Sequence, residues 1–270
     1  TQLLCLLTPE GPCYRVDLRL RPEGSVGEIV TALRPAVEYY HKRARDWELQ
    51  MLIKGRPAAG SLKLGRTFLK SIESLIYQTS TDFSTIERVS ETRDRIQKKL
   101  RRRKPSGLDV KLARGGIRDV EFLVQCMQRL YGGQDPWVRS GGTLFALHRL
   151  QNKGYLSMPD YAMLNSAYQY LRALEHRLQL EDDRQVHTLP VDRDILAVLA
   201  RKMRNLYASD GSVEELLHLV HSHLKNVAEI YERVVHEQRA MALPEEEDPE
   251  LLDTLPHPEP DTEHSWQSQL

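Results

Sequence analysis

One carboxylate in this sequence lies among arginines in a pattern that suits phosphate chemistry. Asp17 alternates with Arg15, Arg19 and Arg21, so in an extended segment these side chains share one face. A carboxylate beside guanidinium groups suits a site that handles metal ions and phosphates. The same alternation is typical of an exposed strand whose charges stay solvated, and the residues alone favour that interpretation.

The opposite face of this segment is apolar. Tyr14, Val16, Leu18 and Leu20 alternate with the charged residues, which predicts a half-buried strand over residues 14–22. One carboxylate cannot hold two metal ions, and the sequence offers no obvious partner for it. The strand therefore supplies at most one ligand of a two-metal site.

Two further cations follow a predicted helix. Apolar and aromatic residues at steps of three and four predict one helix that starts at Pro35 and ends near Lys54, with Trp47 as a core anchor. Lys54 and Arg56 lie at its end, where positive charge stabilises the helix dipole. Their alternative role is contact with nucleotide phosphates.

A pair of glycines precedes a second helix. Residues 109–113 are strand-like, and Gly115 and Gly116 follow them directly before the helical pattern begins. Backbone N–H groups at such a junction can hold an anion, and Lys111 and Arg118 flank it. Two glycines also mark ordinary turns, and the spacing of a P-loop is absent.

The best metal-like grouping lies elsewhere. His176 and His187 flank three acidic residues at 181–183, which leaves a helical metal phosphohydrolase as an alternative function. The few cysteines indicate reduced thiols in a cytoplasmic protein, and no Cys/His grouping has the spacing of a zinc site.

The elements around these residues predict a mostly helical chain of 270 residues. A charged helix over 84–103 ends in the basic run 98–104, and apolar stripes at helical spacing follow after residue 117. The glycines at 132 and 133 should end the first of these later helices. Residues 241–270 are rich in proline and acidic side chains, which predicts a disordered tail.

Charge is divided unevenly along the chain. Residues 1–240 contain 29 acidic and 38 basic side chains, and such a basic body favours phosphate-bearing partners. Aromatic residues do not interleave with the basic run 98–104, so we expect no nucleic-acid partner. No apolar run approaches the length of a membrane span, so we expect no membrane association.

Taken in order, the motifs resemble those of a known enzyme family. The segments that carry the resemblance are 14–22 (YRVDLRLRP), 47–56 (WELQMLIKGR), 109–125 (DVKLARGGIRDVEFLVQ), 174–179 (LEHRLQ) and 185–190 (QVHTLP). They resemble the bifunctional glutamine-synthetase adenylyltransferase/adenylyl-removing enzymes over about residues 10–236. The last two segments are most similar to the N-terminal, adenylyl-removing unit of that family.

The resemblance implies a fold class that is α+β and mostly helical. Residues 1–83 would be the C-terminal part of a nucleotidyltransferase domain of the DNA-polymerase-β type. Residues 84–240 would form an all-α helical bundle domain, before the tail at 241–270.

The resemblance also implies a site and its cofactors. Asp17 matches the third metal-binding carboxylate of the family, a ligand of Mg²⁺ that helps to activate the nucleophile. The candidate residues on the phosphate side of ATP, or of ADP and phosphate, are Arg19, Arg21, Lys54, Arg56, Lys111, Gly115, Gly116 and Arg118. The expected partners are glutamine synthetase and a PII-type signal protein.

One departure from the family pattern affects the expected activity. The Gly-Ser turn and Asp-x-Asp pair that precede the third carboxylate in the family are absent before Asp17. We therefore expect this chain to be a piece of a longer protein and to be inactive alone, because it lacks most of the metal ligands. A non-catalytic docking module for glutamine synthetase or a PII-type protein is the alternative.

Overall fold

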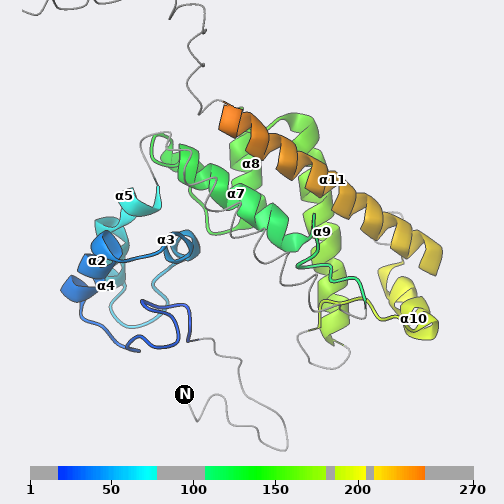
Figure 1. Ribbon diagram of the computed structural model, residues 1–270, viewed down its shortest axis with the longest axis horizontal. Coiled ribbons are helices and arrows are strands. Elements are labelled where there is room, and N and C mark those ends of the chain that lie inside the picture. The colour runs from blue at the N-terminus through cyan, green and yellow to red at the C-terminus, as the bar shows by residue number, and fades with distance from the viewer. Residues whose placement is uncertain (1–17, 78–106, 181–185, 205–209, 241–270) are drawn as a thin grey trace, which may run out of the picture.

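The computed structural model describes residues 18–77, 107–180, 186–204 and 210–240, and these form two groups of helices (Figure 1). The N-terminal group comprises α2 (Leu33–Lys42), α3 (Asp46–Leu52), α4 (Leu62–Ser71) and α5 (Glu73–Ile76). The bundle comprises α7 (Ile117–Tyr131), the 3₁₀ helix η1 (Pro136–Val138), α8 (Thr143–Asn152), α9 (Met158–Leu180), α10 (Arg193–Met203) and α11 (Val213–Ala240). Across these stretches, no helix is both long and apolar enough to cross a membrane.

The bundle is built around α9 and α11. Both helices contact α7 and α10, and α8 packs against α7 and α9 (Figure 1). The apolar stripes predicted from the sequence form its core, and their buried members include Ile117, Val120, Leu147, Leu150, Leu164, Leu171, Leu174, Leu216, Val220 and Val227. The helical prediction for this part of the chain is confirmed, including the end of α7 at Gly132.

The N-terminal group has a small core of its own, made by Tyr39, Tyr40, Ile53, Ile72 and Ile76. The prediction of one helix from Pro35 to Lys54 is wrong, because α2 ends at Lys42 and α3 starts at Asp46. The break follows from a buried carboxylate.

Glu48 reaches back from the first turn of α3 and accepts a hydrogen bond from the backbone N–H of Arg45 at 2.8 Å. The Tyr39 hydroxyl donates to the same carboxylate at 2.8 Å, so Glu48 starts a new helix and fixes it to α2. The prediction of Trp47 as a core anchor is also wrong, because Trp47 is 37% exposed and lines a surface cavity together with Glu48.

The predicted strands are corrected as well. Within the predicted strand 14–22, residues 18–22 form turns, and residues 14–17 lie outside the described part. The Arg21 guanidinium donates to the backbone carbonyls of Leu18, Ser25 and Gly27, so it closes a loop instead of facing a neighbouring strand.

Residues 109–113 likewise form a turn and not a strand. Asp109 makes one isolated antiparallel bridge to Thr188, which is the β pairing found within the described residues. The Asp109 carboxylate then accepts from the backbone N–H groups of Lys111 and Leu112 at 2.9 and 2.8 Å. The domain boundary predicted at 83/84, the helix at 84–103 and the tail at 241–270 lie outside the described residues and stay predictions.

Polar contacts join α7 to α3 and to Lys54, which lies two residues after the end of α3. Asp46 pairs with Arg129 at 3.5 Å, Gln50 donates to Gln125 at 2.8 Å, and Lys54 pairs with Glu121 at 3.2 Å. The partners run in reverse order along the two segments, each time four residues apart, so each segment uses a single face. We call this set of three pairs the α3–α7 contact.

Charge sets the register of the α3–α7 contact. The ion pairs at its two ends have opposite polarity, so a reversed orientation would place Asp46 opposite Glu121 and Lys54 opposite Arg129. The side chains of Gln50 and Gln125 between these ion pairs are both buried. The Gln50 amide donates to the Gln125 carbonyl, so each has a hydrogen-bond partner.

A pair of amide substitutions tests this contact. Gln50→Leu should lower the free energy of unfolding by about 1–3 kcal/mol, because it leaves the buried Gln125 amide without its donor. The double variant Gln50→Leu/Gln125→Leu should recover most of that loss, since both polar groups are then gone. Urea denaturation of the single and double variants measures both changes, and additive losses would contradict the pairing.

Candidate functional site

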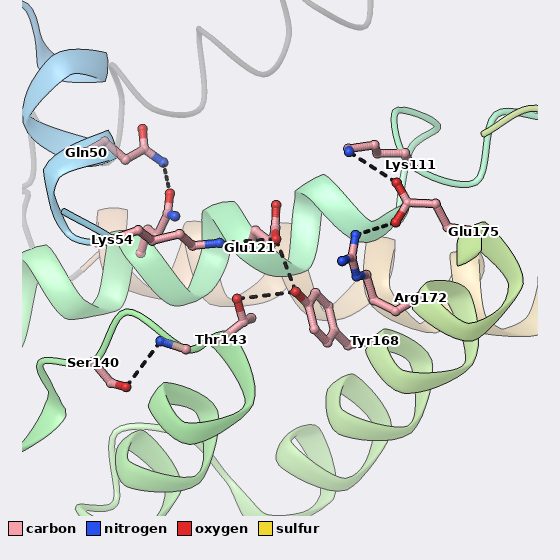
Figure 2. Close-up of polar contacts among 11 residues, drawn as sticks. Gln50, Lys54, Lys111, Glu121, Ser140, Thr143, Tyr168, Arg172 and Glu175 are labelled. Carbon is pink, nitrogen blue, oxygen red and sulfur yellow. Dashed lines mark hydrogen bonds and ion pairs between the residues drawn. The ribbon is translucent and has the colours of Figure 1, made fainter. Parts of the chain in front are cut away.

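A line of polar side chains crosses from the N-terminal group of helices into the bundle (Figure 2). It begins where Lys54 pairs with Glu121 on α7. The Tyr168 hydroxyl on α9 donates to the same oxygen of Glu121 at 3.1 Å and lies 3.4 Å from the Thr143 hydroxyl at the start of α8. One carboxylate thus gathers groups from three parts of the chain.

A second group of polar contacts lies further along the same face of α9, around the carboxylate of Glu175, and we include it in the polar line. Lys111 donates to Glu175 at 3.1 Å, and Arg172 forms a short ion pair with the other oxygen of Glu175 (Figure 2). Gln179 adds a bond to Glu175 at 3.4 Å. The Glu175 side chain is 1% exposed, so its charge is balanced by these partners and not by water.

Local structure explains this arrangement. Tyr168, Arg172 and Glu175 are spaced by four and three residues, so they lie on one face of α9. The turn capped by Asp109 carries Lys111 to that face. The apolar stripe of α9 packs into the core beside it and fixes the rotation of the helix.

Tyr168 acts here as a hydrogen-bond donor. Burial is the main cause that raises the pKa of its hydroxyl, and the Glu121 charge adds to it, while the Arg172 charge opposes both. The phenol therefore keeps its proton near neutral pH and suits binding or orientation of a group more than proton abstraction.

The remaining predicted cations lie in different surroundings. Arg19 and Arg56 are exposed, and Arg21 is engaged by the carbonyls of its own loop. Arg118 lies over the Phe122 ring, with its guanidinium carbon 5.6 Å from the ring centroid. Of the predicted cations, the structure brings Lys54 and Lys111 into the polar line.

The two predicted glycines are packing positions in this structure. The Gly115 N–H donates to Asp119 at 2.7 Å, and the Gly116 N–H donates to the carbonyl of Ala113 at 2.9 Å. Because these amides are engaged within the chain, their contact with a phosphate stays a prediction. Gly115 has φ +79°, and a Cβ atom there would lie 1.8 Å from the carbonyl oxygen of Leu224 on α11.

A cavity of about 370 Å³ opens beside the break between α2 and α3. Its lining residues are Glu23, Val26, Tyr39, Arg43, Arg45, Trp47 and Glu48. Arg43 pairs with Glu23 at 3.2 Å, and Glu48 is already bonded to Tyr39, so both of its carboxylates are engaged.

Metal ligands are not found together in the described stretches, where no group of three His, Cys, Asp or Glu side chains could hold an ion. Asp17 lies outside them, as do the acidic residues 181–183 between His176 and His187. Binding of Mg²⁺ at Asp17 and the metal phosphohydrolase alternative therefore remain untested expectations.

Sequence reasoning missed most of the polar line. Glu121 and Glu175 stood in the recognised motifs without a role, and Tyr168, Arg172 and Thr143 were not singled out. The spacing of 168, 172 and 175 was the available signal, since it places three polar side chains on one helical face beside the leucine stripe.

Two family models match the chain, one after the other. A model described as glutamate-ammonia ligase adenylyltransferase matches residues 1–71, and one described as GlnD PII-uridylyltransferase matches residues 85–235.

The chain is also similar to curated relatives named bifunctional glutamine synthetase adenylyltransferase/adenylyl-removing enzyme. The chain is 36% identical to the protein of Streptomyces coelicolor over 229 residues, 85% of this chain and 22% of the relative. It is 36% identical to that of Caulobacter vibrioides over 261 residues, 92% of this chain and 26% of the relative. Identity to that of Cutibacterium acnes is 39% over 191 residues, 71% of this chain and 19% of the relative. The chain belongs to this family.

The chain spans about a fifth to a quarter of the length of these relatives. Within that span, the α3–α7 contact joins the two matched regions, because Asp46, Gln50 and Lys54 lie in the first and their partners lie in the second. The resemblance predicted from the sequence motifs is confirmed at the level of the family.

A pair of glycine substitutions tests the packing at the start of α7. Gly115→Ala should destabilise the protein by about 3 kcal/mol or more, since it combines a left-handed backbone with a backbone clash. Gly154→Ala is the matched control, because Gly154 has φ +75° with no atom within 4 Å of an added Cβ. It should cost only about 1–2 kcal/mol. Equal losses in thermal or urea unfolding would contradict the close approach to α11.

Proposed function

We propose that, in the whole protein, this chain forms part of a nucleotidyltransferase unit that moves AMP to or from a tyrosine of glutamine synthetase. The observation that carries the proposal is the α3–α7 contact. This contact joins the region that matches the adenylyltransferase model to the helical bundle. One of its members is Lys54, a candidate phosphate-side residue, which pairs with Glu121. The names of the relatives support the same reaction.

Of the two directions, the motifs at 174–179 and 185–190 favour removal of AMP. In that direction an oxygen of inorganic phosphate bonds to the phosphorus of the adenylyl group. The bond from that phosphorus to the tyrosine oxygen breaks, and the products are ADP and the free tyrosine, which takes up a proton. Regulation of nitrogen assimilation through glutamine synthetase follows from this reaction.

The candidate residues divide between metal and phosphate. Asp17 is proposed as a ligand of Mg²⁺, which when bound would neutralise charge on the transferring phosphoryl group. Lys54 and Lys111 are proposed to neutralise phosphate charge, with Arg19, Arg56 and Arg118 as further candidates. Arg21 is proposed to hold the loop after Asp17, since three of its five N–H donors bond to backbone carbonyls of that loop.

Binding to a PII-type signal protein and a location in the cytoplasm remain proposals that rest on the family resemblance. The docking-module alternative makes a different prediction from the catalytic one. A module would bind glutamine synthetase, and no carboxylate in this chain would affect turnover.

Substitution of Asp17 in the full-length protein tests the catalytic proposal. Asp17→Asn should lower the rate of phosphate-dependent release of AMP from adenylylated glutamine synthetase by about 100-fold or more, because a metal ligand is lost. Binding of glutamine synthetase should persist. The assay measures ADP formed from adenylylated glutamine synthetase and phosphate, with the ATP-dependent direction measured in parallel.

Glu38→Gln provides the matched control, because Glu38 is an exposed carboxylate of α2 that pairs only with Lys42 in the described structure. It should retain the wild-type rate. Unchanged rates for Asp17→Asn in both directions would reject a catalytic role for this unit and favour the docking module.

A further inference from the structure

The inference begins from a buried carboxylate whose cationic partners reach the surface. The Glu175 side chain is 1% exposed, whereas the side chains of Lys111 and Arg172 are 31% and 35% exposed. The two cationic heads bind the two oxygens of one carboxylate, so they flank the same group. Both side chains are therefore partly exposed to solvent, while their ion pairs with the buried Glu175 hold the charged groups in place.

The charges in this triad do not cancel. Two cations share one anion, which leaves one net positive charge. A lysine ammonium has three N–H donors and an arginine guanidinium has five, and Glu175 accepts one bond from each head. Donors therefore remain for a further anionic partner.

We propose that Lys111 and Arg172 form a binding subsite for a phosphate group, with Glu175 as the positioning residue beneath them. The proposal rests on the proposed function, which supplies phosphate chemistry at this unit. A guanidinium offers a planar pair of donors that fits a phosphate, and an ammonium adds a compact positive charge beside it. A buried carboxylate that holds both heads reduces the entropy lost when the ligand orders them.

The surroundings of the triad fit this ligand. Arg172 lies one helical turn from Tyr168 on the same face of α9, so the two side chains are neighbours. Tyr168 in turn bonds to Glu121, which pairs with Lys54 (Figure 2). The subsite thus lies at the bundle end of the polar line whose other end is formed by the N-terminal group.

A phosphate group could come from inorganic phosphate or from a nucleotide. Both sources present the same tetrahedral anion, so the geometry identifies the chemistry and binding experiments identify the source. Lys111 provides a local reporter, because its amine reacts with acylating reagents and a bound phosphate should protect it.

The experiment follows modification of Lys111 by mass spectrometry in the full-length protein, at constant ionic strength. Inorganic phosphate or ATP is titrated separately, and the concentration that gives half protection is recorded. Arg172→Gln should raise that concentration about tenfold for at least one of the two ligands, which corresponds to the loss of one charge-assisted hydrogen bond. Arg172→Lys, which keeps the charge, should lie between it and the wild type.

Two controls separate a subsite from general surface charge. Arg193→Gln removes an exposed arginine of the same bundle, which pairs with Glu214, and should change half protection less than twofold. Lys153, which pairs with Asp135, should not be protected by either ligand. A wild-type protein without saturable protection of Lys111, or equal effects of Arg172→Gln and Arg193→Gln, would overturn the inference.

Glu175→Gln distinguishes positioning from charge. It makes the triad more positive, so a site that depends on charge alone would bind phosphate more tightly. We expect weaker protection of Lys111, because the two heads lose their anchor, and tighter protection would overturn the role of Glu175. Circular dichroism confirms that each variant remains folded.

The outcomes also separate this inference from the proposed function. Protection of Lys111 by inorganic phosphate, by ATP or by both supports the subsite. The ligand that protects also identifies the source of the phosphate group. Persistent protection in a protein whose Asp17→Asn variant transfers AMP normally would reject the catalytic proposal and keep the subsite. Loss of transfer in Asp17→Asn, with no protection of Lys111 in the wild type, would reject the subsite alone.

Discussion

The structure depends on a contact that is polar where most helix contacts are apolar. Gln50 and Gln125 meet between two ion pairs of opposite polarity, and together they set the register in which α3 and Lys54 lie on α7. Two apolar helix surfaces can shift slightly against each other at little cost. A buried amide pair between two ion pairs of opposite polarity cannot, because a shift would break its hydrogen bond. The position of Lys54 above Glu121, and with it the start of the polar line, follows from this register.

The helical bundle was predictable because its signal is local. Apolar side chains that recur every three or four residues have one way to be buried together, and α7, α9 and α11 bury them in that way. The alternation over 14–22 was a weaker signal for a strand, because a two-residue period does not show what the charged side chains contact. In the described part of that segment the Arg21 side chain bonds to nearby carbonyls, and the chain turns. Trp47 failed as a core anchor for a similar reason: the buried group of its turn is the Glu48 carboxylate.

The site was predictable only where the resemblance named residues. Lys54 and Lys111 lie in the polar line, but their partners Glu121 and Glu175 are 67 and 64 residues away in the sequence. A charged residue on a helix is most often solvated, so no local pattern marks Glu175 as buried. That burial depends on how α9 is rotated by its leucines and on where the turn at Asp109 delivers Lys111, which are properties of the tertiary structure.

A single oxygen of Glu121 accepts bonds from both Lys54 and Tyr168. The two donors belong to different groups of helices, so both groups bond to the same carboxylate oxygen. If an anionic ligand binds Lys54 and removes it from Glu121, the carboxylate loses a positive partner. The hydrogen bond from Tyr168 to Glu121 then becomes stronger. Linkage is reciprocal, so whatever tightens the hold of Tyr168 on Glu121 equally loosens the hold of Lys54. The shared oxygen of Glu121 thereby couples the free energies of the two bonds, one from each group of helices.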